Sequence, residues 1–167
     1  KPEYHGISDL TRILEEHTEI QFVSFMGIDI GGNGTDEKIP VRLFIKDMKE
    51  MLKHGIQTDG SSVELQGIAD LNNARVDILP DLDCNWFVDY NYEYYKEENG
   101  LPVGTLKIPS FIIHSGKQVC SRSTLKKAEL YFKSQILEIL KNNPNISESL
   151  GFSYEDVEEV LLTSATE

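Results

Sequence analysis

Four consecutive residues, Asp59-Gly60-Ser61-Ser62, bring together one carboxylate, a conformationally free backbone position and two hydroxyl groups. A partly buried carboxylate can stabilise a small cation by its charge, and it can also take up a proton from a nucleophile. Turns favour the same residue types, so the four residues taken alone favour a tight turn over a binding loop. Their chemistry therefore depends on the elements that position Asp59.

The other candidate motifs are weaker. Gly31-Gly32-Asn33-Gly34 opens a predicted hairpin and no helix, so it fails the dinucleotide-binding pattern. Gly116-Lys117 lacks the upstream glycine of a phosphate-binding loop. The four histidines and the two cysteines, Cys84 and Cys120, show no spacing typical of metal ligands. We interpret the cysteines as free thiols in a reducing compartment.

Hydrophobic periodicity predicts the elements that surround this segment. We expect helices over 8–17, 46–54 and 123–142, the last being the longest. Strands are expected over 20–30, 38–45, 76–79, 86–95, 106–114 and 159–163. Short strands and a few helices without strict alternation predict an α+β fold, a mixed sheet packed on helices.

The composition excludes several classes of protein. The chain has 167 residues, 40% of them hydrophobic, and 28 acidic against 16 basic side chains give a net charge of −12. An acidic surface repels phosphates, so we expect no nucleic-acid partner. Acidic residues also alternate with the aromatic residues from Trp86 onward, which favours a sheet face or a subunit contact there over base stacking. No apolar stretch is long enough for a membrane span, and we expect a cytoplasmic protein.

The surroundings of Asp59 resemble the amino-terminal domain of glutamine synthetases. The resemblance rests on Gly55-Ile56-Gln57-Thr58-Asp59-Gly60-Ser61-Ser62, followed by Gly67-Ile68 and by Asp77-Ile78-Leu79-Pro80-Asp81. Ser121-Arg122-Ser123 is similar to the family's Pro-Arg-Ser segment before a long helix, and residues 163–167 resemble the strand that enters the catalytic domain. The order of these motifs along the chain makes an accidental match improbable.

The resemblance implies a fold and a division of the chain. The fold is a β-grasp-like mixed sheet packed on helices, with a long helix after the sheet. We expect an N-terminal helical segment over 1–18, the β-grasp-like domain over 19–115, and the long helix with the first strand of a truncated catalytic domain over 116–167.

The resemblance also implies an activity and the residues that serve it. The family joins glutamate to ammonia with ATP, and its amino-terminal domain docks on the catalytic domain of a neighbouring subunit in a homo-oligomeric ring. By this match Asp59 is the ammonium-site aspartate, Ser62 is the adjacent serine, and Glu167 is the first glutamate of the Glu-x-Glu metal motif. ATP and Mg²⁺ or Mn²⁺ are expected in the full-length parent, with none bound to this fragment, which we expect to be inactive alone.

Two alternatives stay open. One is a related ligase that joins glutamate to a larger amine or polyamine, in which Glu64 beside the motif contacts the cationic acceptor. The other is a stand-alone β-grasp interaction module without a catalytic domain.

Overall fold

The computed structural model describes residues 7–60, 63, 75–95, 100–157 and 160–161. The chain divides into two compact units, Lys1–Ser121 and Arg122–Glu167. The three-part division expected from the sequence stays a prediction.

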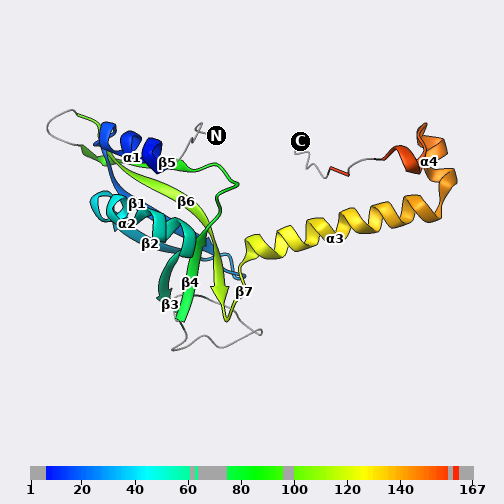
Figure 1. Ribbon diagram of the computed structural model, residues 1–167, viewed down its shortest axis with the longest axis horizontal. Coiled ribbons are helices and arrows are strands. Elements are labelled where there is room, and N and C mark those ends of the chain that lie inside the picture. The colour runs from blue at the N-terminus through cyan, green and yellow to red at the C-terminus, as the bar shows by residue number, and fades with distance from the viewer. Residues whose placement is uncertain (1–6, 61–62, 64–74, 96–99, 158–159, 162–167) are drawn as a thin grey trace. The chain divides into compact units, whose positions relative to one another are not determined.

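The first unit contains the sheet and two helices (Figure 1). Its elements in chain order are α1 (Ile7–Glu16), β1 (Ile20–Ile28), β2 (Gly34–Pro40), α2 (Val41–His54), β3 (Ile56–Asp59), β4 (Arg75–Pro80), β5 (Phe87–Tyr95), β6 (Pro102–His114) and β7 (Lys117–Gln118). A long helix, α3 (Ser121–Asn142), follows the sheet. The predicted α+β class with a β-grasp-like mixed sheet and a subsequent long helix is confirmed.

Strand β6 organises the sheet, whose main strand order among the described residues is β2-β1-β6-β4-β3. The first part of β6 pairs parallel with β1, where Val23 lies opposite Leu106, and antiparallel with β5. Its last part pairs antiparallel with β4 and β7. β2 and β3 therefore lie at opposite ends of this order, and α2 connects them along the chain.

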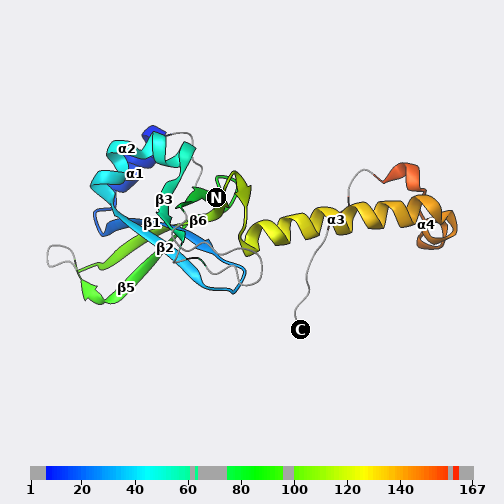
Figure 2. The ribbon, with the colours of Figure 1, turned by 90° about the horizontal axis from the view of Figure 1, so that it is seen from below.

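The main core lies between the sheet and the two helices of the first unit, which cover the same face (Figure 2). Leu10 and Leu14 of α1 pack in one cluster with side chains of α2 and of the central strands. The fully buried members are Val23, Phe25, Phe44, Ile78 and Ile108, each with 0% exposure. Alternation along β1 sends Val23 and Phe25 toward this cluster and Ser24 to the other face.

The sequence-based boundary between the second strand and the following helix is wrong. A strand was expected over 38–45, but β2 ends at Pro40 and α2 begins at Val41. Proline has no N–H to donate to a strand ladder, while its fixed φ suits the residue before a helix. The apolar residues that suggested a strand instead begin a helical stripe of Phe44, Met48 and Leu52, all buried.

The second unit consists of most of α3 with α4 (Pro144–Leu150) and a short 3₁₀ turn (Tyr154–Asp156). Leu140, near the end of α3, is buried. The predicted apolar stripe of α3 is largely exposed in this chain, since Leu125, Phe132 and Ile139 have 70%, 57% and 51% exposure. The strand expected over 159–163 falls largely outside the described residues.

Within the described residues, no helix is long and apolar enough to cross a membrane. Cys84 and Cys120 are not joined by a disulfide bond.

Candidate functional site

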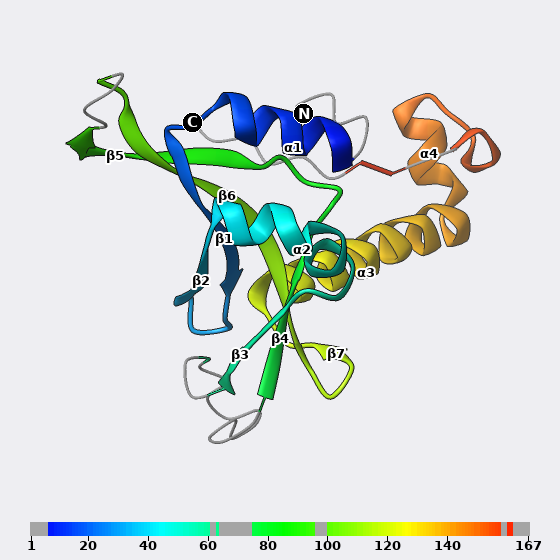
Figure 3. The same cartoon turned by 60° about the vertical axis from the view of Figure 1, so that its left-hand side comes forward.

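β3 is the last strand of the main sheet order and lies beside β4 (Figure 3). Asp59 is the last residue of β3. The register places Asp59 opposite Arg75 and Thr58 opposite Val76. Thr58 is only 7% exposed and Asp59 is exposed, because successive side chains of a strand point to opposite faces. The sequence motif therefore starts with a carboxylate on the outer face of an edge strand.

A turn anchored in the interior follows Asp59. The N–H of Val63 donates to the carbonyl of Gly60 at 3.0 Å. The Val63 side chain is 6% exposed and belongs to a second apolar cluster, which also contains Val76 and Phe111. Asp59 is thus held between two inward-pointing side chains, Thr58 before it and Val63 after it. This hydrogen bond is of the kind that closes a tight turn, and Ser61 and Ser62 between its ends lie outside the described residues.

The outer face of β3 and β4 is polar around Asp59. Gln57 and Asp59 share one face of β3, and Asp77 and Arg75 lie opposite them on β4. The Gln57 side-chain amide donates to Asp77 Oδ1 at 3.5 Å. Arg75 is the residue directly opposite Asp59, and its side chain is permanently cationic. Opposite charges in directly opposed positions on neighbouring strands attract each other.

A second carboxylate, Glu37 of β2, lies on the inner face. Thr58 Oγ1 donates a hydrogen bond to Glu37 Oε1. Glu37 lies opposite Phe25 in the β1–β2 register, so its side chain emerges on the face that α2 covers. Sequence reasoning missed Glu37. Its signal is an acidic residue between Thr35 and Ile39, at the inward-facing parity of β2.

The Pro80-Asp81 segment of the motif is also structurally defined. Asp81 is 3% exposed, and its carboxylate accepts a hydrogen bond from the N–H of Asp83 at 3.0 Å. Its carbonyl oxygen accepts from Cys84 Sγ and from Trp86 Nε1, each at 3.2 Å. Asp81 therefore organises the turn from β4 into β5, which is a structural role.

An ion pair lies on the face of the sheet opposite α2. Asp36 of β2 accepts hydrogen bonds from Lys107 Nζ of β6 and from Ser24 Oγ of β1. Burial raises the pKa of the Asp36 carboxyl, but the hydrogen bonds from Lys107 and Ser24 and the positive charges of Lys107 and Lys38 outweigh it, so the pKa is lowered. Asp36 is therefore ionised at neutral pH, and the pair ties three strands together.

Two of the three predicted site residues, Ser62 and Glu167, lie outside the described residues. Their roles stay predictions. In the part of the chain that the structure describes, no group of three or more His, Cys, Asp or Glu side chains could hold a metal ion.

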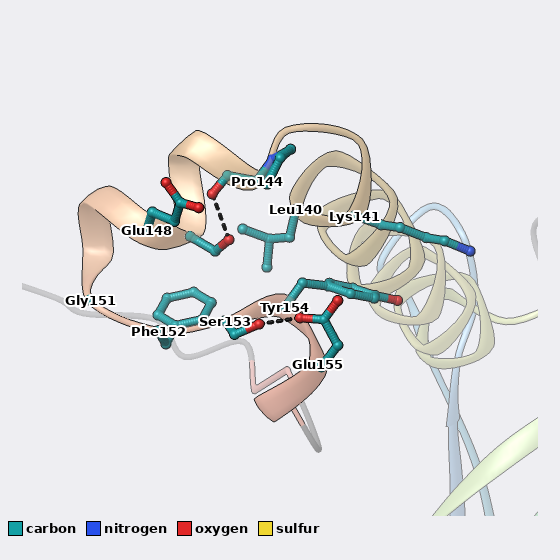
Figure 4. A pocket seen from close by; sticks show the side chains of 10 residues that line it. Leu140, Lys141, Pro144, Glu148, Gly151, Phe152, Ser153, Tyr154 and Glu155 are labelled. Carbon is teal, nitrogen blue, oxygen red and sulfur yellow. Dashed lines mark hydrogen bonds between the residues drawn. The ribbon is translucent and has the colours of Figure 1, made fainter.

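The second unit contains a hollow of about 830 Å³ between the end of α3, α4 and the segment after it (Figure 4). Leu140, Phe152 and Tyr154 supply its apolar wall, and Glu148 and Glu155 are among its polar side chains. Ser153 Oγ donates to Glu155 at the rim. Asp59, the predicted site residue that the structure describes, is not among the residues that line this hollow.

Comparison with known proteins identifies the fold. No family model matches the chain, and no curated protein matches it. A cryo-EM structure of Plasmodium falciparum glutamine synthetase aligns with 84% of this chain and 23% of that chain, with a TM-score of 0.52 and 17% identity. The chain has a glutamine synthetase-type fold.

Two structures of GmaS, a gamma-glutamylmethylamide synthetase, are also similar. The complex of GmaS with ADP has a TM-score of 0.47 and 17% identity over 74% of this chain and 25% of that chain. Apo GmaS has a TM-score of 0.43 and 18% identity over 66% of this chain and 22% of that one. The chain thus spans about a quarter of the length of the glutamine synthetase-type structures that it matches.

Proposed function

We propose that this chain is the amino-terminal part of an ATP-dependent glutamate–ammonia ligase, and that it contributes the ammonium-site loop to the active site of a neighbouring subunit. The observation that carries the proposal is the position of Asp59, exposed at the end of an edge strand in a glutamine synthetase-type fold. The order of the surrounding sequence motifs supports the same assignment.

The position of Asp59 suits a loop that acts on another subunit. A carboxylate on an outer face stays solvated in the isolated chain, and it becomes partly buried when a second subunit covers it. Its attraction for ammonium strengthens as water is excluded and the local dielectric constant falls. The same carboxylate then accepts a proton from ammonium, which leaves neutral ammonia as the nucleophile. Ser62 lines the same site in this proposal.

The remaining parts of the active site belong to the parent protein. The proposal includes ATP, glutamate and Mg²⁺ or Mn²⁺ as its ligands, a homo-oligomeric ring, and Glu167 as one carboxylate of the metal site. Carboxylate oxygens are suitable ligands for either metal. One carboxylate does not make a metal site, so the chain on its own is expected to be inactive.

The test is an assay of the full-length protein that contains this chain. Phosphate release and amide product are measured with ATP, Mg²⁺ and glutamate, using ammonium, methylamine or a diamine as the acceptor. Release that requires ammonium supports the proposal. Release only with methylamine or the diamine replaces it by a ligase for larger amines, and no release with any acceptor contradicts the ligase assignment.

A further inference from the structure

We propose that Glu37 is a positioning residue for Asp59 and that it acts through the hydroxyl group of Thr58. This inference rests on the proposed function, because the role that it assigns to Glu37 is in ammonium binding. Glu37 belongs to none of the sequence motifs described above. Thr58 Oγ1 donates to Glu37 Oε1, and Asp59 is the next residue along β3.

The first support is the burial of Thr58. Its side chain points toward the interior, where only 7% of the residue is exposed. A buried hydroxyl group requires a hydrogen-bond partner, since burial without one leaves its desolvation uncompensated. Glu37 supplies the acceptor from a strand 21 residues earlier in the sequence. The bond fixes the side of β3 that faces inward, and by alternation it fixes the side on which Asp59 emerges.

The second support is the topology of the sheet. β2 and β3 are the two ends of the main strand order, so no ladder hydrogen bonds connect them among the described pairings. The Thr58–Glu37 bond joins these two ends across the inner face.

The third support is the shortness of β3. The strand has four residues and lies at the end of the sheet order, where β4 is its one neighbour among the described strands. A short edge strand paired on one side is easily displaced, so a hydrogen bond from its inner face strongly affects its position. A shift of about 1 Å in a binding group can change a rate by a hundredfold.

Glu37 does not contact the ammonium ion in this arrangement. It bonds to the inward-pointing Thr58, whereas Asp59 emerges on the opposite face of β3. Its role therefore depends on its ability to accept a hydrogen bond and not on its charge. This distinction determines the choice of variants.

The experiment measures the KM for ammonium, the KM for glutamate and kcat in the full-length protein. Thr58→Val and Glu37→Ala each remove one partner, and we expect each to raise the ammonium KM about tenfold, with the glutamate KM unchanged. Thr58→Ser and Glu37→Gln each keep a donor or an acceptor, and we expect both to remain close to wild type. Thr35→Val is the matched control, a buried threonine on the same face of β2 as Glu37.

Hydrogen exchange on the same proteins gives a readout that is independent of activity. We expect Thr58→Val and Glu37→Ala to speed exchange at the amides of residues 58–60, and Thr35→Val to leave those amides unchanged. All kinetics are measured below the melting temperature of each variant. If Thr58→Val does not fold, the contrast between Glu37→Ala and Glu37→Gln makes the same test.

The possible failures are distinguishable. Wild-type protein that makes no glutamine removes the proposed function, and the positioning role is removed with it. Wild-type activity with an unchanged ammonium KM in Thr58→Val and Glu37→Ala overturns the positioning role alone. A similar rise in the ammonium KM in Thr35→Val, or no rescue by Glu37→Gln, also overturns it, because the effect then reflects general destabilisation or the charge of Glu37.

Discussion

Lys107 Nζ lies 2.5 Å from Asp36 Oδ2, which links β6 to β2 across the intervening strand β1. The exposed fractions of the two side chains are 10% for Lys107 and 29% for Asp36, so the ammonium group is buried and the carboxylate keeps partial contact with water. Ser24 on β1 donates to the other carboxylate oxygen of Asp36. Removal of Asp36 from this pair is expected to destabilise the fold, because the charge of the buried Lys107 is then left without its partner.

The pKa of Asp36 leads to a prediction about pH. Because the folded-state pKa is lowered below the ordinary value, the ionised form contributes stability that is present above the unfolded-state pKa of about 3.9. This contribution is lost as the pH falls through the lower folded-state value. We expect Asp36→Asn to lower the free energy of unfolding by about 1–3 kcal/mol at pH 7, and the difference from wild type to shrink below about pH 4.

Urea unfolding at pH 7 and at successively lower pH measures this difference. Asp89→Asn, an exposed aspartate on β5, is the matched control and should have little effect at any pH. An Asp36→Asn penalty that stays constant down to the lowest pH at which the protein folds would contradict the role of the ionised pair.

Gly55 is expected to tolerate no side chain. It follows α2 with φ of +73°, and a Cβ there would lie 2.3 Å from the carbonyl oxygen of Ile78. Gly100 has a similar φ of +65° but open space around it. Gly100→Ala should therefore cost about 1–2 kcal/mol from backbone strain alone, and Gly55→Ala clearly more. Thermal unfolding of the two variants makes the comparison, and equal losses would show that the contact with Ile78 is unimportant.

The core beneath α2 is expected to depend on Phe44. Its ring has 0% exposure and meets Phe25 edge to face, with 6.1 Å between ring centroids. Phe44→Ala should lower the free energy of unfolding by about 3–5 kcal/mol. The preceding residue, Leu43, is 45% exposed, so Leu43→Ala should cost much less. Chemical denaturation of both variants tests whether the inward face of α2 supplies the stability.

The carboxylate of Asp59 is expected to matter for the acceptor amine alone. In the full-length protein, Asp59→Asn keeps the shape of the side chain but removes its charge. We expect a higher KM for ammonium and a turnover lowered by about 100-fold or more, the range of one general base. The KM for glutamate should be nearly unchanged. Steady-state kinetics with each substrate varied in turn measure these effects, and Asp89→Asn is the control. Wild-type kinetics in Asp59→Asn would exclude Asp59 from the site.

Much of the fold could be predicted from local pattern. The spacing of Leu10 and Leu14 indicated α1, and Gly55 marked the end of α2. The boundary between β2 and α2 could not be placed, because the residues after Pro40 include β-branched and aromatic side chains that suit either a strand or a buried helix. There the helix formed because its apolar face packs on the sheet.

The candidate site was also predictable only in part, because local sequence pattern does not show contacts between distant parts of the chain. The residue types around Asp59 indicated a turn after a strand; the structure has the strand, β3, and a hydrogen bond from the N–H of Val63 to the carbonyl of Gly60. The bond between Thr58 and Glu37 depends on the two ends of the sheet meeting, which no local pattern in either strand contains. Ser62 and Glu167 stay predictions from the sequence resemblance.

The parallel pairing of β1 with β6 has a consequence for synthesis of the protein on the ribosome. Val23 cannot meet Leu106 until nearly the whole sheet domain has left the exit tunnel, although α1 and the β1–β2 hairpin can form earlier. Until then the edge of β1 that pairs with β6 in the folded protein has no partner strand. Such long-range pairing slows folding and leaves exposed strands open to aggregation. Nascent chains that end before β6 should therefore depend on chaperones more than chains that include it.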